Sequence, residues 1–143
     1  MWVIKVADIT FQDNTIAISN SIEDRAAAFL DEAAGEMASK TAARSRRRTG
    51  QTAGAWDYTL DRGKLEATVG NPLKNAIWEE YGTGEYALMG NGRRGGWVYK
   101  DPVTGQFYHT YGKTPNRAFY TTFKELENPI VEMAQKFFRE LNK

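Results

Sequence analysis

Apolar residues recur at helical spacing near both ends of the chain. Between residues 20 and 44, apolar side chains and alanines repeat every three or four positions, and acidic residues after Asn20-Ser21 predict the helix start there. Between residues 116 and 142, a second apolar stripe contains Phe119, Phe123, Leu126, Ile130, Met133, Phe137 and Leu141. The pattern predicts two long amphipathic helices.

A proline interrupts the second stripe. Asn128-Pro129 fits the start of a new helix, with asparagine as its cap, and also fits a kink within one continuous helix. The sequence leaves both arrangements open.

Segments of alternating polarity lie at the N-terminus and between the helices. Residues 2–19 predict a hairpin whose turn is residues 12–14 and whose second strand contains Ile16 and Ile18. Residues 55–70 and 97–110 predict two further hairpins. Because strands joined by hairpins form antiparallel sheets, we expect an α+β fold in one domain, residues 1–143. In this fold one antiparallel sheet of about five or six strands is covered by the two long helices.

A glycine-rich segment follows a short helix predicted at residues 74–81. Six of the fifteen residues from 82 to 96 are glycine, and aromatic residues flank them on both sides. Too little apolar area is present to offset the entropy of ordering this segment. We therefore expect residues 82–96 to form a mobile functional loop, with a floppy surface hairpin as the simpler alternative.

The overall composition narrows the classes of function. The net charge is +1, so any electrostatic attraction must come from local clusters. The chain has no cysteine, no signal-peptide pattern and no apolar run long enough to cross a bilayer. We expect a soluble protein made in a cytoplasm, without contact to membranes.

No residue pattern predicts catalysis. Residues 90–95 spell G-x-G-x-x-G, but no helix follows to hold a pyrophosphate. The single histidine, His109, lies in a predicted strand without a nucleophile or acid at motif spacing, and Glu79 and Glu80 point about 100° apart on a helix. Metal-ligand spacings are absent too. We therefore expect no enzyme activity, no cofactor and no metal.

Positive charge gathers in two places. Residues 44–48 contain four arginines. They are suited to binding phosphates or an acidic partner surface, and they are equally typical of a solvated helix end. Residues 82–117 add five cations against two acids. With the neighbouring aromatic residues, these zones allow a small module that binds single-stranded nucleic acid.

Several short motifs occur in one order along the chain. They are Thr49-Gly50-Gln51-Thr52, residues 56–58 (Trp-Asp-Tyr), residues 69–71 (Val-Gly-Asn), residues 78–84 (Trp-Glu-Glu-Tyr-Gly-Thr-Gly), residues 92–97 (Gly-Arg-Arg-Gly-Gly-Trp) and residues 112–115 (Gly-Lys-Thr-Pro). This series, with its terminal helix, resembles the tail-completion family of head–tail joining proteins of long-tailed bacteriophages. The resemblance spans about residues 20–143, and Glu-Tyr-Gly-Thr-Gly is its most specific part.

The resemblance implies a structural protein of the virion. Such proteins form a ring, typically sixfold, in the neck between the head connector and the tail tube, after assembly in the bacterial host cytoplasm. The expected partners are further copies of the chain, the head-connector or head-completion protein and the tail tube protein, with weak non-specific contact to DNA. We expect the assembly interface to comprise Arg46, Arg47, Arg48, Tyr81, Gly82, Thr83, Gly84, Glu85, Tyr86, Arg93, Arg94 and Trp97.

Overall fold

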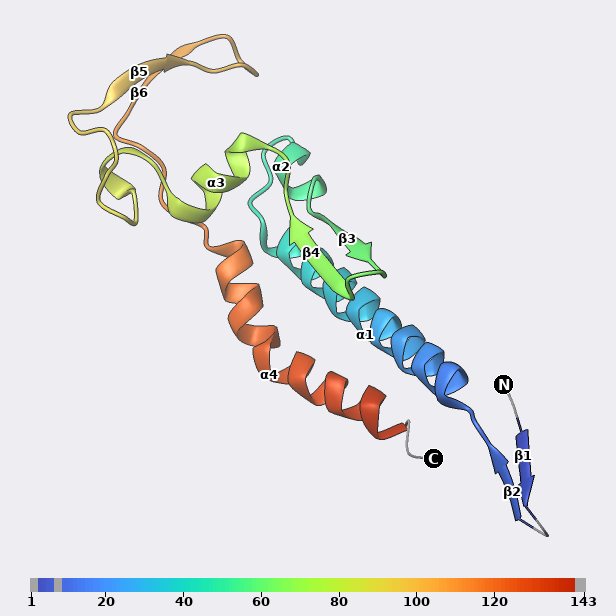
Figure 1. The fold of residues 1–143 in the computed structure, drawn as a ribbon. Coiled ribbons are helices and arrows are strands. Elements are labelled where there is room, and N and C mark those ends of the chain that lie inside the picture. The colour runs from blue at the N-terminus through green and yellow to red at the C-terminus, as the bar shows by residue number, and fades with distance from the viewer. Residues whose placement is uncertain (1–2, 7–8, 141–143) are drawn as a thin grey trace.

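The fold is described from a computed structural model that covers residues 3–6 and 9–140, with side chains from residue 12 onward. Helices and short hairpins alternate along the chain (Figure 1). In order, the elements are β1 (Val3–Val6), β2 (Ile9–Gln12), α1 (Thr15–Arg44), α2 (Gln51–Gly54), β3 (Asp57–Asp61), β4 (Glu66–Gly70), α3 (Lys74–Tyr81), the 3-10 turn η1 (Gly84–Tyr86), β5 (Trp97–Lys100), β6 (Phe107–Thr110) and α4 (Ala118–Arg139).

Helix α1 is the longest element in the structure, and the other parts of the body pack against it. Its 30 residues correspond to about 45 Å of helix. Helix α4 runs back along α1 in the opposite direction, and the β3–β4 hairpin also lies against α1 (Figure 1). These three parts form the body of the protein.

The core of the body is built mostly from small residues. Alanine favours the helix and lets another element approach α1 closely. On the hairpin side, the ring of Tyr58 lies over Gly35, and Trp56 stacks on Phe119 of α4 with ring centroids 5.5 Å apart. The buried residues of α1 are Ala26, Ala27, Ala33, Ala34, Met37, Ala38 and Thr41.

The prediction of one sheet with five or six strands is wrong. The described strands pair as three separate two-stranded antiparallel sheets, β1–β2, β3–β4 and β5–β6. The reason is distance, because β1–β2 lies beyond the start of α1 and β5–β6 lies beyond its far end (Figure 1). The chain is α+β with long N-terminal and C-terminal helices, but those helices pack on each other and cover no common sheet.

The predicted strand through Ile16 and Ile18 is also wrong. Helix α1 already begins at Thr15, and the N-terminal hairpin is formed by β1 and β2 alone. The carboxylate of Asp13 accepts hydrogen bonds from the backbone N–H (2.9 Å) and hydroxyl of Thr15, which satisfies a free donor at the helix start. Both isoleucines are exposed, so the alternation of apolar and polar residues here does not correspond to a strand with one buried face.

Helix α4 settles the alternatives at Asn128-Pro129, because it is one helix with Pro129 inside it and a visible bend (Figure 1). Leu126 is 1% exposed and belongs to the core, whereas Phe123 is 44% exposed. The apolar stripe predicted from the sequence therefore does not mark the core at every position, and Phe123 lies at the surface. Leu141 of the predicted stripe lies outside the described residues.

Candidate functional site

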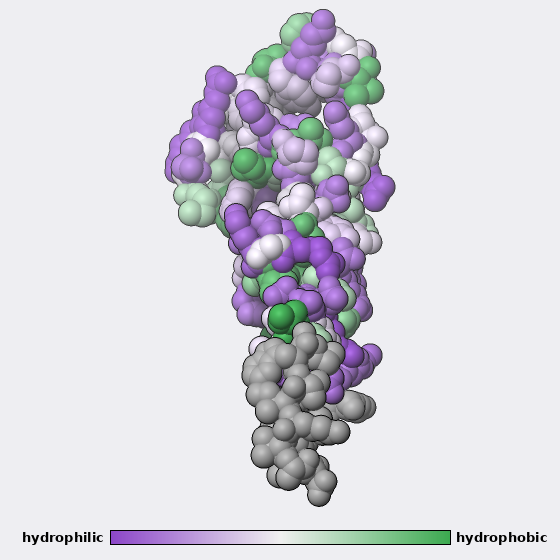
Figure 2. All heavy atoms as spheres, turned by 45° about the vertical axis from the view of Figure 1, so that its right-hand side comes forward, coloured by the Kyte–Doolittle hydropathy of each residue, from purple (hydrophilic) through white to green (hydrophobic). Residues whose placement is uncertain are grey.

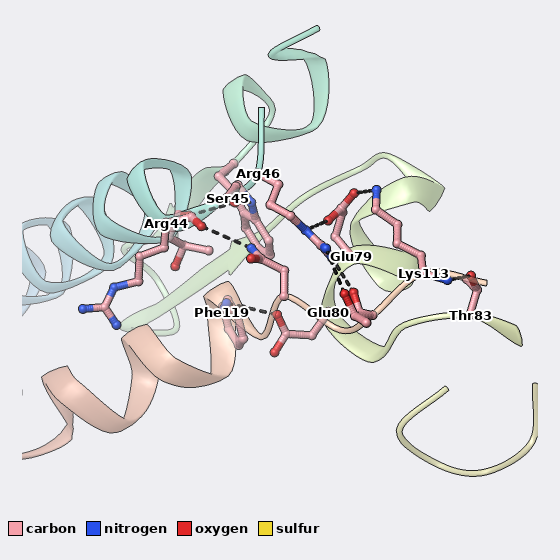
Figure 3. Close-up of polar contacts among 12 residues, drawn as sticks. Arg44, Ser45, Arg46, Glu79, Glu80, Thr83, Lys113 and Phe119 are labelled. Carbon is pink, nitrogen blue, oxygen red and sulfur yellow. Dashed lines mark hydrogen bonds and ion pairs between the residues drawn. The ribbon is translucent and has the colours of Figure 1, made fainter. Parts of the chain in front are cut away.

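A polar junction joins the end of α1, helix α3, the segment at residues 110–117 and the start of α4 (Figure 3). It is built around Glu79 and Glu80, which occupy the last turn of α3. Neighbouring positions on a helix point in different directions. The two carboxylates therefore serve different partners.

Glu79 holds two cations from distant parts of the chain. Its carboxylate lies 2.9 Å from Nε of Arg46 and also contacts Nζ of Lys113 (Figure 3). Arg46 donates further hydrogen bonds to the hydroxyl and the carbonyl oxygen of Thr114. The end of α1 is thereby fastened to both α3 and the segment that leads into α4.

Glu80 caps helix α4. Its two carboxylate oxygens accept hydrogen bonds from the backbone N–H groups of Phe119 (3.0 Å) and Tyr120 (2.9 Å). A carboxylate at this place satisfies free donors and interacts favourably with the helix dipole. The motifs of the sequence do not predict this role, although the lack of any acidic residue in the first turn of α4 is a signal for it.

The first part of the glycine loop runs against residues 111–113. The backbone N–H of Thr83 donates to the carbonyl of Lys113 (2.9 Å), and that of Glu85 donates to the carbonyl of Tyr111 (2.8 Å). Gly84 has φ +60°, and a Cβ there would collide with the Tyr111 carbonyl. Glycine is therefore required here both by the backbone conformation and by the close approach of the two segments.

The rest of the loop also makes internal contacts. The N–H of Leu88 donates to the carbonyl of Tyr81 (2.8 Å), and that of Gly95 donates to the carboxylate of Glu85 (3.1 Å). The guanidinium of Arg93 lies 5.6 Å from the ring centre of Trp97. These contacts define one arrangement of the loop, and its mobility stays a prediction.

The β5–β6 hairpin is attached to the end of α1 by an ion pair. The carboxylate of Asp101, 2% exposed, contacts the guanidinium of Arg48 and accepts from the N–H groups of Val103 (2.7 Å) and Thr104 (3.0 Å). The hydrogen bond from Thr104 is the main cause that lowers the pKa of Asp101, although burial opposes it, and Arg48 lowers this pKa further. The same pair raises the pKa of Arg48.

A cleft of about 1060 Å³ opens between the end of α1, helix α3 and the β5–β6 hairpin. Four cations line it, and three of them, Arg46, Arg48 and Lys113, are paired with the mostly buried carboxylates of Glu79 and Asp101. Although Lys113 contacts Glu79, burial and then the charges of Arg46 and Arg48 lower the pKa of this lysine. The cleft is therefore positively charged, and its walls also contain Trp78, Trp97 and Tyr99.

The structure places the predicted interface residues in four settings, one of which is the half-buried pair Thr83 and Trp97. Gly82 and Gly84 are buried where backbones meet, while Arg46 and Arg48 are exposed but already paired with carboxylates. Exposed positions without an opposite charge within the described chain include Arg47. The other exposed members of the set are Tyr81, Glu85, Tyr86, Arg93 and Arg94.

The groups considered for chemistry in the sequence were the single histidine and the metal-ligating side chains. His109 packs edge-on against Tyr111 with ring centroids 4.9 Å apart, and no cluster of three metal-ligating side chains occurs among residues 12–140. No described helix has the length and apolarity to cross a membrane. The notable surface features are the charged cleft, the exposed aromatic residues and the separate hairpins.

The chain matches no protein-family model, no curated protein and no solved structure. The resemblance to phage tail-completion proteins therefore rests on the sequence motifs alone.

Proposed function

We propose that this chain is a structural subunit of the neck of a long-tailed bacteriophage. Copies of it form a ring that completes the tail and joins it to the head connector. The protein is located in the host cytoplasm during assembly and then in the neck of the virion. Its partners are further copies, the head-connector or head-completion protein and the tail tube protein. The proposal needs no catalytic group or cofactor.

The observation that carries this proposal is the large surface of the single chain. The chain exposes 10339 Å², whereas a compact monomer of 16.1 kDa exposes about 7,400 Å². The excess is about 2,900 Å². A ring subunit with two standard interfaces buries about 1,600 Å² of its own surface, so assembly accounts for much of the excess.

Large apolar side chains on that surface support the same conclusion. On the face shown in Figure 2, hydrophobic residues form separate patches between hydrophilic ones. Interfaces are enriched in aromatic residues, and a two-stranded hairpin alone in water is marginal. Exposed examples around the glycine loop and the β5–β6 hairpin are Ile77, Trp78, Tyr81, Tyr86, Leu88, Met89, Val98, Val103, Phe107 and Tyr108.

Concentrated protein provides the test. Analytical ultracentrifugation over a concentration series, with negative-stain electron microscopy of the concentrated samples, should detect a closed ring with one subunit number. A protein that remains monomeric at every concentration would contradict the proposal.

The glycine loop allows a second test of the same proposal. Arg93→Glu with Arg94→Glu should change the free energy of unfolding by less than about 0.5 kcal/mol, because both residues are exposed. The double variant should still fail to form rings, since rim charges set encounter and register. Normal rings from a folded variant would remove this loop from the interface.

A second candidate function is a small nucleic-acid-binding module. The specific observation in its favour is the cleft, where cations and tryptophans lie together. Binding of single-stranded DNA that falls steeply with salt, without ring formation, would favour this alternative.

A further inference from the structure

The cleft at the end of α1 has more positive charge than its own carboxylates neutralise. Arg46 and Lys113 share one carboxylate, that of Glu79, and Arg48 is paired with Asp101. Arg47 has no carboxylate within the described part of the chain and donates only a weak hydrogen bond, 3.4 Å, to a backbone carbonyl. The cleft can therefore accept further negative charge.

The other half of α1 has the opposite sign. Residues 15–36 of α1, called the acidic half here, contain five acids and one arginine, whereas residues 37–48, which are the end of α1 and the segment that follows it, contain five cations and no acid. Within the acidic half, Asp24 is paired with Arg62 and Glu36 with Lys40. Glu32 is exposed, and no ion pair holds it among the described residues.

This separation of charge favours contact between copies. Complementary potentials steer encounter and fix register, and like charges placed together are costly. A contact between two different surfaces of identical chains also repeats from subunit to subunit, which is what a ring requires. Nucleic acid is disfavoured as the occupant because the carboxylate of Glu79 already lies in the wall and the whole chain has a net charge of only +1.

We propose that the cleft of one copy binds the acidic half of α1 of a second copy, with Glu32 directed at Arg47. This inference rests on the proposed function and names the two surfaces that meet. The excess surface described above is large enough for this contact.

Charge reversal on each side tests the pairing. Arg47→Glu alone and Glu32→Arg alone should each weaken self-association by about tenfold or more, measured by analytical ultracentrifugation, because each places like charges together. The double variant with both changes restores the pair with reversed sign. The dissociation constant of its self-association should return to within about threefold of the wild-type value.

Matched controls come from α4. Lys124→Glu and Glu127→Arg change the net charge by the same amounts at exposed positions of the first half of α4, which is outside the cleft lining and lies near Arg44 rather than near the acidic residues of α1. Both should self-associate as wild type does. Thermal melting followed by circular dichroism checks that each variant folds, and Arg47→Ala, with a smaller expected loss, serves if Arg47→Glu does not fold.

The outcomes separate this inference from the proposed function. If wild type never self-associates, both are wrong. If single reversals leave rings intact, or if the double variant does not recover, the cleft does not bind α1 and the ring function stands. If the reversals act as expected but the species is a closed dimer, the contact is right and the ring is wrong. If a labelled single-stranded oligonucleotide binds wild type but not Arg47→Glu while self-association is unchanged, the cleft is a nucleic-acid site.

Discussion

The body and the junction are held together by different interactions. In the body, small apolar residues of α1 pack against α4 and the β3–β4 hairpin, and Leu126 is fully enclosed. In the junction and its loops, charged groups and backbone hydrogen bonds connect segments that are far apart in sequence. The body therefore depends on buried apolar area, while the junction and its loops depend on geometry and charge.

The largest expected effect is in the body. Leu126→Ala should lower the free energy of unfolding by about 2–5 kcal/mol, because it opens a cavity beside α1. Phe123→Ala is the matched control on the same helix, and its loss should be clearly smaller since that ring is 44% exposed. Urea unfolding measures both. Equal losses would contradict the core described here.

The next effect is confined to the glycine loop. Gly84→Ala should weaken loop closure by more than about 1 kcal/mol, because it combines a left-handed backbone with a collision against the neighbouring segment. Gly90→Ala, also at positive φ but with open space around it, should cost about 1 kcal/mol from the backbone alone. Amide exchange at Thr83 and Glu85 reports the difference. If both variants exchange alike, close approach does not explain Gly84.

A smaller effect is expected at the cap of α4. Glu80→Gln keeps an acceptor but removes the charge, so it should cost about 0.3–1 kcal/mol, and Glu80→Ala about 1–2 kcal/mol. Glu132→Gln, at an exposed position further along α4, should stay within about 0.5 kcal/mol of wild type. Urea unfolding again gives the values. An unchanged free energy of unfolding in Glu80→Ala would mean that the cap does not contribute to stability.

The smallest expected effect is local and depends on pH. The folded pKa of Asp101 is below 3.8, so its ionised contacts stabilise the hairpin above that value and are lost as the pH falls through the lower folded pKa. Amide exchange at Val103 and Thr104, corrected for intrinsic rates, should therefore accelerate in acid. Asp101→Asn should remove this pH dependence. An unchanged profile in the variant would show that Asp101 does not secure the hairpin.

Local pattern predicted much of the secondary structure. The short helix at residues 74–81 is confirmed by α3, and the hairpins at residues 55–70 and 97–110 are confirmed by β3–β4 and β5–β6. Alternation and helical spacing report only the burial of neighbouring residues. They could not report that α1 holds the hairpins too far apart to share a sheet.

The predicted interface set has the same limit. Composition identified the arginines and the glycines, but not that Glu79 would neutralise Arg46 or that Asp101 would hold Arg48. Such pairs join residues distant in sequence, so no local pattern contains them. The sequence shows Glu80 as a neighbour of Glu79 and as part of the motif at residues 78–84, and its role as a cap depends on α4 lying beside α3.

Pro129 has a consequence for how α4 comes apart. Proline has no backbone N–H, so the carbonyl of Glu125 loses its helical partner and the ladder of α4 is interrupted at one rung. Beyond the bend, the second half of α4 runs along α1 (Figure 1). There the ring centroids of Phe137 and Phe29 lie 6.1 Å apart, and Glu140 forms an ion pair with Arg25. We therefore expect fraying that starts at the C-terminal end to stop at the proline, while the first half of α4 stays packed on α1.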